Sequence, residues 1–448
     1  MPSPFRPAPR IGLALFKEDP RGLAAIIALQ RGAMKAKILV VGGGVMGTCI
    51  AQYAAKKCDP LGEPVILIEK GQLGDGSSSR AGGIIYQNYS DRVLAGMARD
   101  AIKIYAGFEG IAGRSVGFRR TGVLSLVGPD NNERRTQLEA DIAMQNSIGI
   151  ATRFIGDDEI RQLVPGIEIA GGTVAAWEPE SGFVDPSRTI RAFATLARAY
   201  GAVTRIGVSE PRVLIKNGRA VGVETDQGTF TAPKIVLATG SWMPSMLREL
   251  DVDLPLRVLK TDQVYLSMPT PGGEDGDEDF GESQFDSTDP FIADLEARFG
   301  PDPAERRASA HPIIFDHDEG FSVRCDPVRD RTRIGRLGVE GLEETNPEDP
   351  PGKIDPKLIM WAREAVSKRL PVYTEQTQVG LQSTQVTVTP DERPIVGPIE
   401  AIPGLYMVTG FSGNDFQLAP TIGEGMAQML HEQPVSAFDT EFFSAGRF

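Results

Sequence analysis

Three glycines and one acidic residue near the start of the chain have the spacing of a dinucleotide-binding site. Gly42, Gly44 and Gly47 follow the apolar run 38–41, and a second apolar run ends in Glu69. Gly42 permits a tight turn, Gly44 lets a pyrophosphate approach the backbone, and Gly47 lets the next helix pack closely on the strand. A carboxylate at Glu69 accepts hydrogen bonds from both ribose hydroxyls and repels a 2′-phosphate. The pattern predicts FAD or NAD rather than NADP; a glycine-rich turn without a ligand is the alternative.

Two short strands and one helix must position these residues. The runs 38–41 and 65–68 are β-branched and too short for a helix, so we expect buried parallel strands. A helix at 45–57 begins directly after the glycines, and its first N–H groups would bind the phosphates. A further strand of the same sheet is expected at 234–242. Besides the glycines, the cofactor contacts predicted on these elements are Val45, Met46, Thr239, Gly240 and Trp242.

A loop of small residues at 74–85 follows the second strand. It is too polar for a core and too rich in glycine for a helix, which indicates backbone lying against a ligand. The cofactor contacts predicted from this part of the chain are Lys70, Ser78, Ser79, Arg80, Ala81, Gly82 and Gly83.

Composition excludes several classes of protein. A net charge of −13 argues against a nucleic-acid partner and against an anionic membrane surface. The 3 cysteines and 3 histidines are too few and too scattered for a disulfide framework or a metal site, so we predict no metal and a reducing, cytoplasmic location. No apolar run is long enough to span a membrane. A chain of 448 residues exceeds the usual limit of one core, which favours two domains.

Several segments outside these sites also have patterns that predict their structure. Residues 1–34 are interpreted as an extension outside the core, with a partner-binding or targeting arm as the alternative. The acidic loop 269–287 is interpreted as solvated, with a lid or a docking patch as the alternative. Asp185 and Pro186 predict the start of a helix that reaches about residue 200. Short antiparallel strands are expected at 203–206, 212–215, 220–225 and 229–232.

Motifs at both ends of the chain carry a family resemblance through their order. After the glycine cluster and the small-residue loop come 182–186 (GFVDP), 389–398 (TPDERPIVGP), 403–413 (PGLYMVTGFSG) and the final Arg447-Phe448. Together they resemble the FAD-dependent D-amino acid oxidase superfamily, most of all its sarcosine oxidase β-subunit and glycine oxidase branch. The resemblance covers about residues 36–448.

This resemblance implies an α/β fold with two domains. A Rossmann-like FAD-binding domain, with a mixed sheet flanked by helices, would comprise 35–115, 186–258 and 376–448. An α+β substrate domain with a large antiparallel sheet would comprise 116–185 and 259–375.

The implied activity is the removal of a hydride from the C–H bond next to an amine nitrogen to flavin N5, after which water hydrolyses the imine. The implied substrate is a small amine, an amino acid or an N-substituted amino acid. The electron acceptor would be oxygen or an electron-transfer partner. The resemblance also leaves open whether the chain forms a homo-oligomer or a hetero-oligomer. Thr384 stands where relatives with covalent flavin have a cysteine, and no histidine precedes His311, which predicts non-covalent FAD.

The resemblance also places residues around the flavin ring. A helix that opens near Pro420 would direct its positive end toward the ring. The remaining cofactor contacts implied are Val208, Gly413, Asn414, Asp415, Phe416 and Gln417. Look-alikes commonly have Ser-Gly-His-Gly in the last of these segments, so the substitution by Asn414 and Asp415 puts sarcosine-type carboxylate binding in doubt.

Three residues are candidates for contact with substrate. Arg324 would hold a substrate carboxylate by a bidentate pair, with a surface arginine as the alternative. Arg333 stands where monomeric sarcosine oxidase has the lysine that promotes the reaction with oxygen. Tyr86 would line the substrate pocket, or would pack within a strand.

Two other functions stay open. The same fold could oxidise a 2-hydroxy acid as an FAD-dependent dehydrogenase, and His311 or His317 would then have to enter the pocket as the base. The chain could instead be a flavoprotein subunit or assembly factor with little activity of its own, which the unusual Asn414-Asp415 pair favours.

Overall fold

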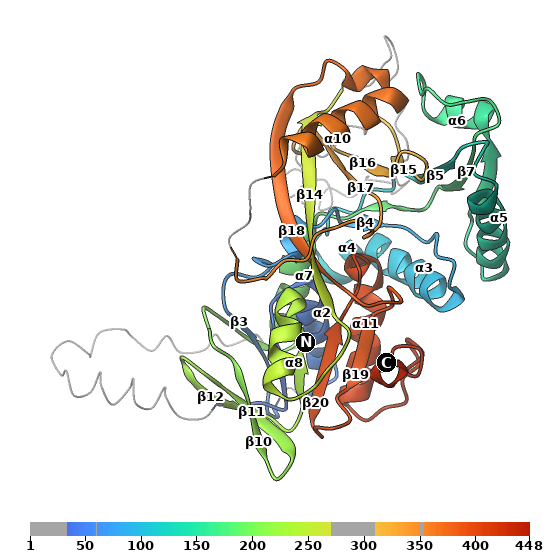
Figure 1. Ribbon diagram of the computed structural model, residues 1–448. Coiled ribbons are helices and arrows are strands. Elements are labelled where there is room, and N and C mark those ends of the chain that lie inside the picture. The colour runs from blue at the N-terminus through green and yellow to red at the C-terminus, as the bar shows by residue number, and fades with distance from the viewer. Residues whose placement is uncertain (1–33, 60, 270–309, 350–353) are drawn as a thin grey trace, which may run out of the picture.

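Two β-sheets, one below the other in Figure 1, organise the molecule. The computed structural model describes residues 34–59, 61–269, 310–349 and 354–448. The extension predicted at 1–34 and the acidic loop predicted at 269–287 therefore lie almost wholly outside the described residues.

The lower sheet has six strands in the order β19-β20-β13-β2-β3-β9. All neighbours are parallel except β19, which is antiparallel to β20. The bounds are Ile38–Val41 (β2), Val65–Glu69 (β3), Val203–Ile206 (β9), Ile235–Leu237 (β13), Ile395–Pro398 (β19) and Leu405–Thr409 (β20). The parallel strands predicted at 38–41 and 65–68 are confirmed by their pairing, and every residue of β2 is buried. The strand predicted at 234–242 exists in the same sheet but is shorter: β13 ends at Leu237, and Gly240–Trp242 forms a 3-10 helix.

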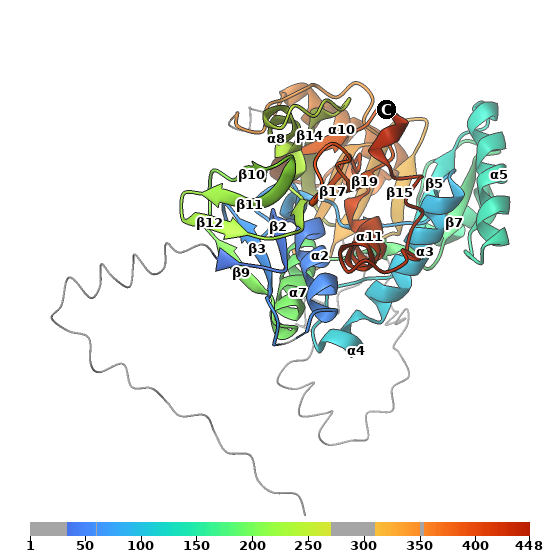
Figure 2. The ribbon, with the colours of Figure 1, turned by 90° about the horizontal axis from the view of Figure 1, so that it is seen from below.

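Helices cover one face of this sheet and a small antiparallel sheet covers the other. On the first face lie α2 (Val45–Lys56), α3 (Arg92–Ala106), α7 (Pro186–Ala199) and α11 (Asp415–Leu430), which Figure 2 shows grouped together. On the second face pack α8 (Met243–Glu249) and a sheet of β1 (Met34–Lys35), β10 (Arg212–Lys216), β11 (Arg219–Thr225) and β12 (Gly228–Thr231).

The upper sheet has eight strands in the order β18-β14-β17-β16-β15-β5-β7-β6. Its neighbours are antiparallel except for β15 and β5, which confirms the expected large antiparallel sheet. The bounds are Val123–Val127 (β5), Arg153–Gly156 (β6), Val174–Glu178 (β7), Arg257–Ser267 (β14), Ile313–Asp316 (β15), Phe321–Asp326 (β16), Arg331–Arg336 (β17) and Gln378–Val388 (β18).

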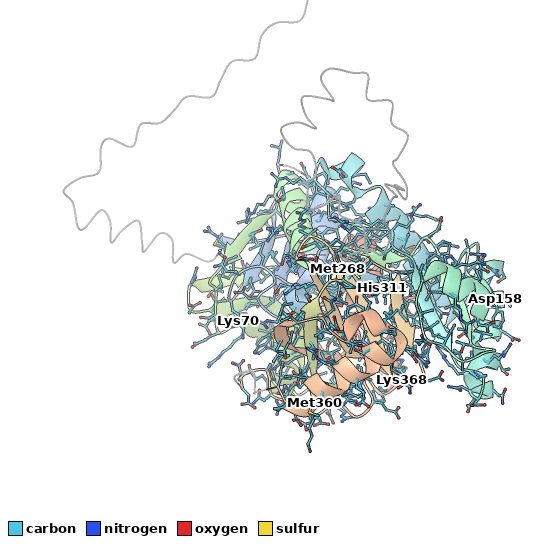
Figure 3. The ribbon with its side chains drawn as sticks, turned by 90° about the horizontal axis from the view of Figure 1, so that it is seen from above. Lys70, Asp158, Met268, His311, Met360 and Lys368 are labelled. Atoms are coloured by element: carbon cyan, nitrogen blue, oxygen red, sulfur yellow. The ribbon has the colours of Figure 1, made fainter. Side chains whose placement is uncertain are left out.

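Three helices surround the upper sheet. Helix α10 (Pro356–Arg369) covers its outer face, and Figure 3 shows Met360 and Lys368 of this helix at the surface. Helices α5 (Asn132–Ser147) and α6 (Asp157–Leu163) pack at the β6–β7 edge. The remaining short elements are α4 (Phe108–Ala112) and the pair β4 (Ile84–Ile85) and β8 (Gly182–Phe183).

The predicted start of helix α7 is confirmed. The Asp185 side chain accepts a hydrogen bond from the Arg188 N–H at 2.8 Å, and Pro186 is the first helical residue. The prediction for 203–206 was wrong, because β9 pairs in parallel with β3 and not with its neighbours in sequence.

Helix α11 begins at Asp415, five residues before the predicted start near Pro420, which lies inside the helix. A proline has no N–H, so Pro420 leaves the Phe416 carbonyl without its usual helical donor. The hydroxyl of Tyr105 donates to that carbonyl at 2.8 Å instead. A distant residue therefore allows the helix to continue through a proline.

Within the described residues, no helix has the length and apolar character needed to cross a membrane. The exact domain boundaries stay a prediction.

Candidate active site

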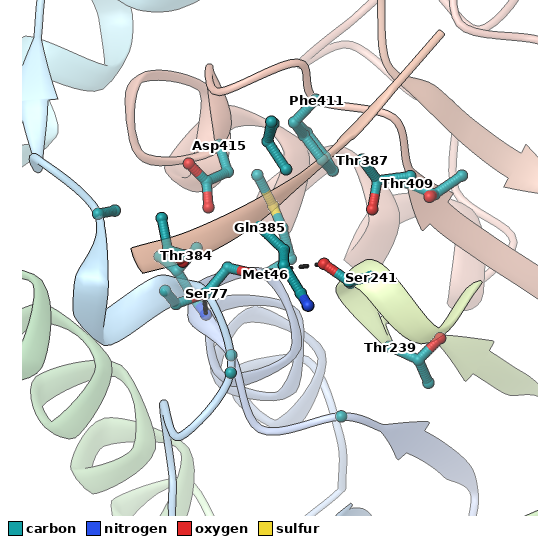
Figure 4. Close-up of a pocket in the computed structure, with 18 of the residues that line it drawn as sticks. Met46, Ser77, Thr239, Ser241, Thr384, Gln385, Thr387, Thr409, Phe411 and Asp415 are labelled. Carbon is teal, nitrogen blue, oxygen red and sulfur yellow. Dashed lines mark hydrogen bonds between the residues drawn. The ribbon is translucent and has the colours of Figure 1, made fainter. Parts of the chain in front are cut away.

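A cavity of about 1050 Å³ lies between the two sheets. It extends from the carboxyl ends of β2, β3 and β13 to polar side chains of β14, β17 and β18, and Figure 4 shows part of its lining. Segments far apart in the chain meet here, including the glycine cluster, the small-residue loop and the first turn of α11.

At the end of the cavity formed by the glycine cluster, neither Gly42 nor Gly47 has room for a side chain. Gly42 has a φ of +110°, and a Cβ added there would lie 2.3 Å from the Ala238 carbonyl oxygen. A Cβ added at Gly47 would lie 1.8 Å from the Gly42 carbonyl oxygen. Only glycine therefore permits both the turn and the close approach of α2 to β2.

The N-terminus of α2 opens into this end of the cavity. Gly44 caps the helix without a side chain, and the first turn has no acidic residue. The Val45 N–H donates to Ser78 Oγ at 3.1 Å. Such an N-terminus is suited to an anionic group such as a pyrophosphate.

Glu69 lines the cavity next to this turn. Its two carboxylate oxygens accept from the Gly43 N–H at 2.6 Å and from the Gly71 N–H at 2.8 Å. These hydrogen bonds fix the carboxylate at the end of β3. Beyond it, Lys70 Nζ lies 3.5 Å from the ring centroid of Trp242, whose N–H donates to Glu348.

Three threonine hydroxyls in the wall have no hydrogen-bond partner. Thr384 and Thr387 of β18 and Thr409 of β20 are buried and line the cavity, as Figure 4 shows. Buried hydroxyls are normally paired, because an unpaired one costs about 1–3 kcal/mol. The three hydroxyls therefore fit a ligand with several polar atoms in this part of the cavity.

Arg333 is a partly buried cation of the cavity wall. Its Nε donates to Gln263 Oε1 at 2.8 Å, and its Nη1 lies where a Cβ at Gly82 would come within 2.7 Å. Burial lowers the pKa of Arg333 to about 10, so the guanidinium stays charged at neutral pH.

Tyr86, Tyr89 and Asn414 form a hydrogen-bonded group near Asp415. The hydroxyls of Tyr86 and Tyr89 donate to Asn414 Oδ1 at 2.7 and 3.2 Å, and their rings stack at 5.1 Å between centroids. The ring of Phe315 meets Tyr86 edge-on at 5.2 Å. The amide and the rings hold one another in place.

Asp415 brings a carboxyl group into the same region. It lines the cavity in the first turn of α11, as Figure 4 shows. Burial raises its pKa to about 6. The group is therefore largely ionised at neutral pH and titrates near pH 6.

Comparison with known proteins identifies the family. The family described as FAD dependent oxidoreductase matches residues 37–429. The chain belongs to this family. The cavity features above fit FAD: a helix N-terminus for the pyrophosphate, Glu69 for a ribose and threonine hydroxyls for polar ring atoms.

Several individual proteins are similar to this chain over most of its length. The chain is 25% identical to peroxisomal sarcosine oxidase of Homo sapiens over 92% of this chain and 95% of that protein. It is 24% identical to 4-methylaminobutanoate oxidase (formaldehyde-forming) of Paenarthrobacter nicotinovorans and to a mitochondrial pyruvate dehydrogenase phosphatase regulatory subunit of Mus musculus. These two matches cover 92% and 88% of this chain, and this chain spans less than half of each protein, 45% and 41%.

A solved structure shows the same fold. The L-proline dehydrogenase from P. horikoshii superposes with a TM-score of 0.76 at 24% identity, over 93% of this chain and 98% of that one. The α/β fold inferred from the family resemblance is thereby confirmed.

The structure brings most of the predicted site residues to the one cavity. Those that line it are Gly42, Gly44, Val45, Met46, Glu69, Lys70, Ser78, Ala81, Gly82, Gly83, Tyr86, Val208, Thr239, Gly240, Trp242, Arg333, Gly413, Asn414, Asp415, Phe416 and Gln417. Gly47, Ser79 and Arg80 do not line it: Gly47 packs α2 on the turn, and the Arg80 guanidinium donates to the Gly76 carbonyl on the exposed side.

Arg324 and the two candidate histidines lie elsewhere. Arg324 lines a separate, smaller cavity of about 230 Å³. His311 Nε2 lies 2.8 Å from the Tyr373 hydroxyl, in a buried group with Cys325. Neither His311 nor His317 lines the large cavity, as far as the described residues show.

Sequence reasoning missed the wall made by β14 and β18. Gln263, Thr387 and Thr409 line the cavity and carry the polar groups described above, and Phe315 packs on Tyr86. A weak signal was present in the sequence, because residues 382–387 of β18 include Gln, Ser and Thr side chains that could bind a polar ligand.

Proposed function

We propose that this enzyme oxidises the C–H bond next to the amine nitrogen of an amino acid or an N-substituted amino acid. The observation that supports this most is the position of Arg333, a partly buried cation in the cavity that also carries the unpartnered threonine hydroxyls. The names of the relatives agree, since sarcosine, 4-methylaminobutanoate and proline all combine an amine with a carboxylate.

Arg333 would bind the substrate carboxylate. Its Nε is held by Gln263, which fixes the guanidinium and leaves its terminal nitrogens for a ligand. Arg324, which sequence reasoning favoured for this role, is two residues beyond Ser322 on β16, and only Ser322 lines the large cavity. The proposal therefore moves the carboxylate contact from Arg324 to Arg333.

Asp415 would face the amine end of the substrate. An ionised carboxyl attracts a substrate ammonium and repels a second carboxylate, so it would orient a zwitterion relative to Arg333. The Tyr86–Tyr89–Asn414 group would form the rigid side of this pocket.

FAD, when bound, supplies the acceptor for the two electrons and the hydrogen that the substrate loses. The protein would supply position and charge. Non-covalent attachment of FAD and a cytoplasmic location are part of this proposal, as is oxygen or an electron-transfer partner as the final acceptor.

Anaerobic bleaching of the flavin tests the proposal. We expect bleaching by some members of a panel of amino acids and N-methyl amino acids, and none by 2-hydroxy acids. In Arg333→Gln, kcat/KM for the best substrate should fall about 10- to 100-fold, because a charge-assisted hydrogen bond is worth about 1.5–3 kcal/mol.

Arg336→Gln is the matched control, because Arg336 also lines the cavity but its guanidinium lies over the Trp361 ring at 4.6 Å. We expect kcat/KM to change less than threefold in this variant. Equal losses in both variants would contradict the role of Arg333. Peroxide formation in air would distinguish an oxidase from a dehydrogenase.

One alternative keeps support from a specific observation. The regulatory subunit of pyruvate dehydrogenase phosphatase is among the relatives, so a role as a flavoprotein subunit remains the second candidate. A flavin that no compound in the panel bleaches, together with a partner protein that copurifies, would favour it. The 2-hydroxy acid alternative loses its candidate bases, because His311 and His317 do not line the large cavity in the described part of the chain.

A further inference from the structure

A second cavity of about 230 Å³ lies beside the N-terminus of α7. Its charged lining consists of four guanidinium groups and two carboxylates, from Arg119, Arg188, Arg324, Arg329, Asp185 and Asp326. It is separate from the large cavity: Phe183 lines the small one, and Ile84, its partner in the β4–β8 ladder, lines the large one.

Arg324 is a buried cation with unfilled donors. Only 5% of its surface is exposed, and its guanidinium lies over the Phe183 ring at 4.3 Å. Nη1 donates to the Cys325 carbonyl at 3.3 Å, whereas Nε has no partner. A buried charge with unpaired donors is costly unless an anion completes its hydrogen bonds.

The nearest carboxylate does not complete them. Arg324 Nη2 is 3.9 Å from Asp326 Oδ2, beyond hydrogen-bond distance. The same oxygen already accepts from Arg329 Nη1 at 3.1 Å and lies 3.7 Å from Arg331 Nε. One carboxylate oxygen is therefore shared by three guanidinium groups.

A second positive charge lies on the neighbouring strand, β17. Arg333 is the partner of Arg324 in the β16–β17 register, and its side chain lines the large cavity. Two guanidinium groups on directly paired residues, one buried and one partly buried, repel each other unless anions offset their charges. The substrate carboxylate would offset the charge of Arg333, whereas the only ion pair that the described residues show for Arg324 is the long contact with the shared Asp326 oxygen.

We propose that the small cavity binds a small carboxylate anion through Arg324. The Nε–H and Nη2–H groups lie on one edge of the guanidinium and form the parallel pair of donors that matches the two oxygens of a carboxylate. Nε lacks a partner and Nη2 has only the 3.9 Å contact, so this is the edge left without a hydrogen bond. The volume admits a molecule of a few heavy atoms, such as malonate.

Calorimetric titration of the FAD-loaded enzyme with malonate tests this site. The flavin absorbance spectrum reports on the large cavity in the same titration. We expect one malonate per chain to bind with heat but without a change of the flavin spectrum. In Arg324→Gln the dissociation constant of this step should rise about tenfold or more. Lys216→Gln, which removes one positive charge at an exposed hairpin turn away from both cavities, should leave it unchanged.

A second variant covers the case in which Arg324→Gln does not fold. Val328 lines the small cavity and is only partly buried, so Val328→Trp fills the space and keeps every charge. This variant should also lose the spectrally silent binding step. The proposal is overturned if the wild-type enzyme shows no such step, or if Val328→Trp binds malonate as tightly as the wild type. Inorganic phosphate that binds more tightly than malonate would refute the carboxylate assignment. None of these outcomes depends on which substrate is oxidised in the large cavity.

Discussion

The buried carboxyl of Asp415 should make the stability of the enzyme depend on pH. Burial raises its pKa from 3.8 to about 6, and this difference corresponds to about 3 kcal/mol. Since the pKa is raised in the folded state, the stabilising effect is complete below pH 3.8 and is lost as the pH rises through about 6. Above pH 6 the folded protein holds an ionised group in a partly enclosed site.

Asp415→Asn cannot ionise and keeps the shape of the side chain. We therefore expect the free energy of unfolding to be about 1–3 kcal/mol higher than that of the wild type at pH 8, and nearly equal at pH 4. The lower figure allows for the part of the side chain that faces the cavity. Urea unfolding with excess FAD, followed by tryptophan fluorescence at several pH values, measures this difference.

Asp391→Asn is a control with the opposite sign. Burial alone would raise the pKa of Asp391, but hydrogen bonds from Arg447 and from the Arg393 N–H lower it to about 2. Its contribution is present above pH 3.8 and is lost as the pH falls through about 2, so Asp391→Asn should lose about 1 kcal/mol at pH 8. The reasoning would be refuted if Asp415→Asn had a lower free energy of unfolding than the wild type at pH 8. It would also be refuted if the difference in free energy of unfolding were the same at all pH values.

Three further substitutions, one of them with a matched control, test the cavity and its supports. Gly47→Ala should weaken FAD binding more than tenfold, because its Cβ would meet the Gly42 carbonyl, whereas Gly96→Ala, with open space in α3, should stabilise the protein by about 0.5–1 kcal/mol; flavin fluorescence and thermal unfolding measure the two effects. Thr384→Val should raise the dissociation constant of FAD about 3- to 10-fold if the unpartnered hydroxyl contacts the cofactor, and an unchanged value would exclude that contact. Tyr105→Phe should lower the free energy of unfolding by about 1–3 kcal/mol, because the Phe416 carbonyl loses its donor, and a loss below about 0.5 kcal/mol would contradict this.

Predictions from the sequence were most accurate for structural features that depend only on neighbouring residues. The turn at Gly42, the helix after it and the cap at Asp185 each involve a few consecutive residues, and local rules describe them well. The strand β9 has the same local pattern as the hairpin strands that follow it. Its parallel partner β3 is more than a hundred residues away, so no local signal separates the two cases.

The limits of helix α11 show the same dependence on distance. Proline is most common in the first turn of a helix, but Pro420 lies inside α11, five residues after its start. The donor that satisfies the Phe416 carbonyl comes from Tyr105 in α3. The contact that lets α11 continue through Pro420 therefore comes from a distant part of the chain, which a rule based on neighbouring residues does not include.

The two arginines of the β16–β17 pair show why a site residue cannot be chosen by type alone. Arg324 is buried, Arg333 is partly buried and the two are directly paired, so each is a cation that could hold a carboxylate. The packing of Phe183 decides between them, because its ring lies against Arg324 and lines only the small cavity. If each arginine binds its own anion, neutralising Arg324 with malonate would reduce the positive potential at Arg333 and weaken the binding of an anionic substrate. The KM for substrate should then rise with malonate concentration in the wild type, and this rise should be absent in Val328→Trp.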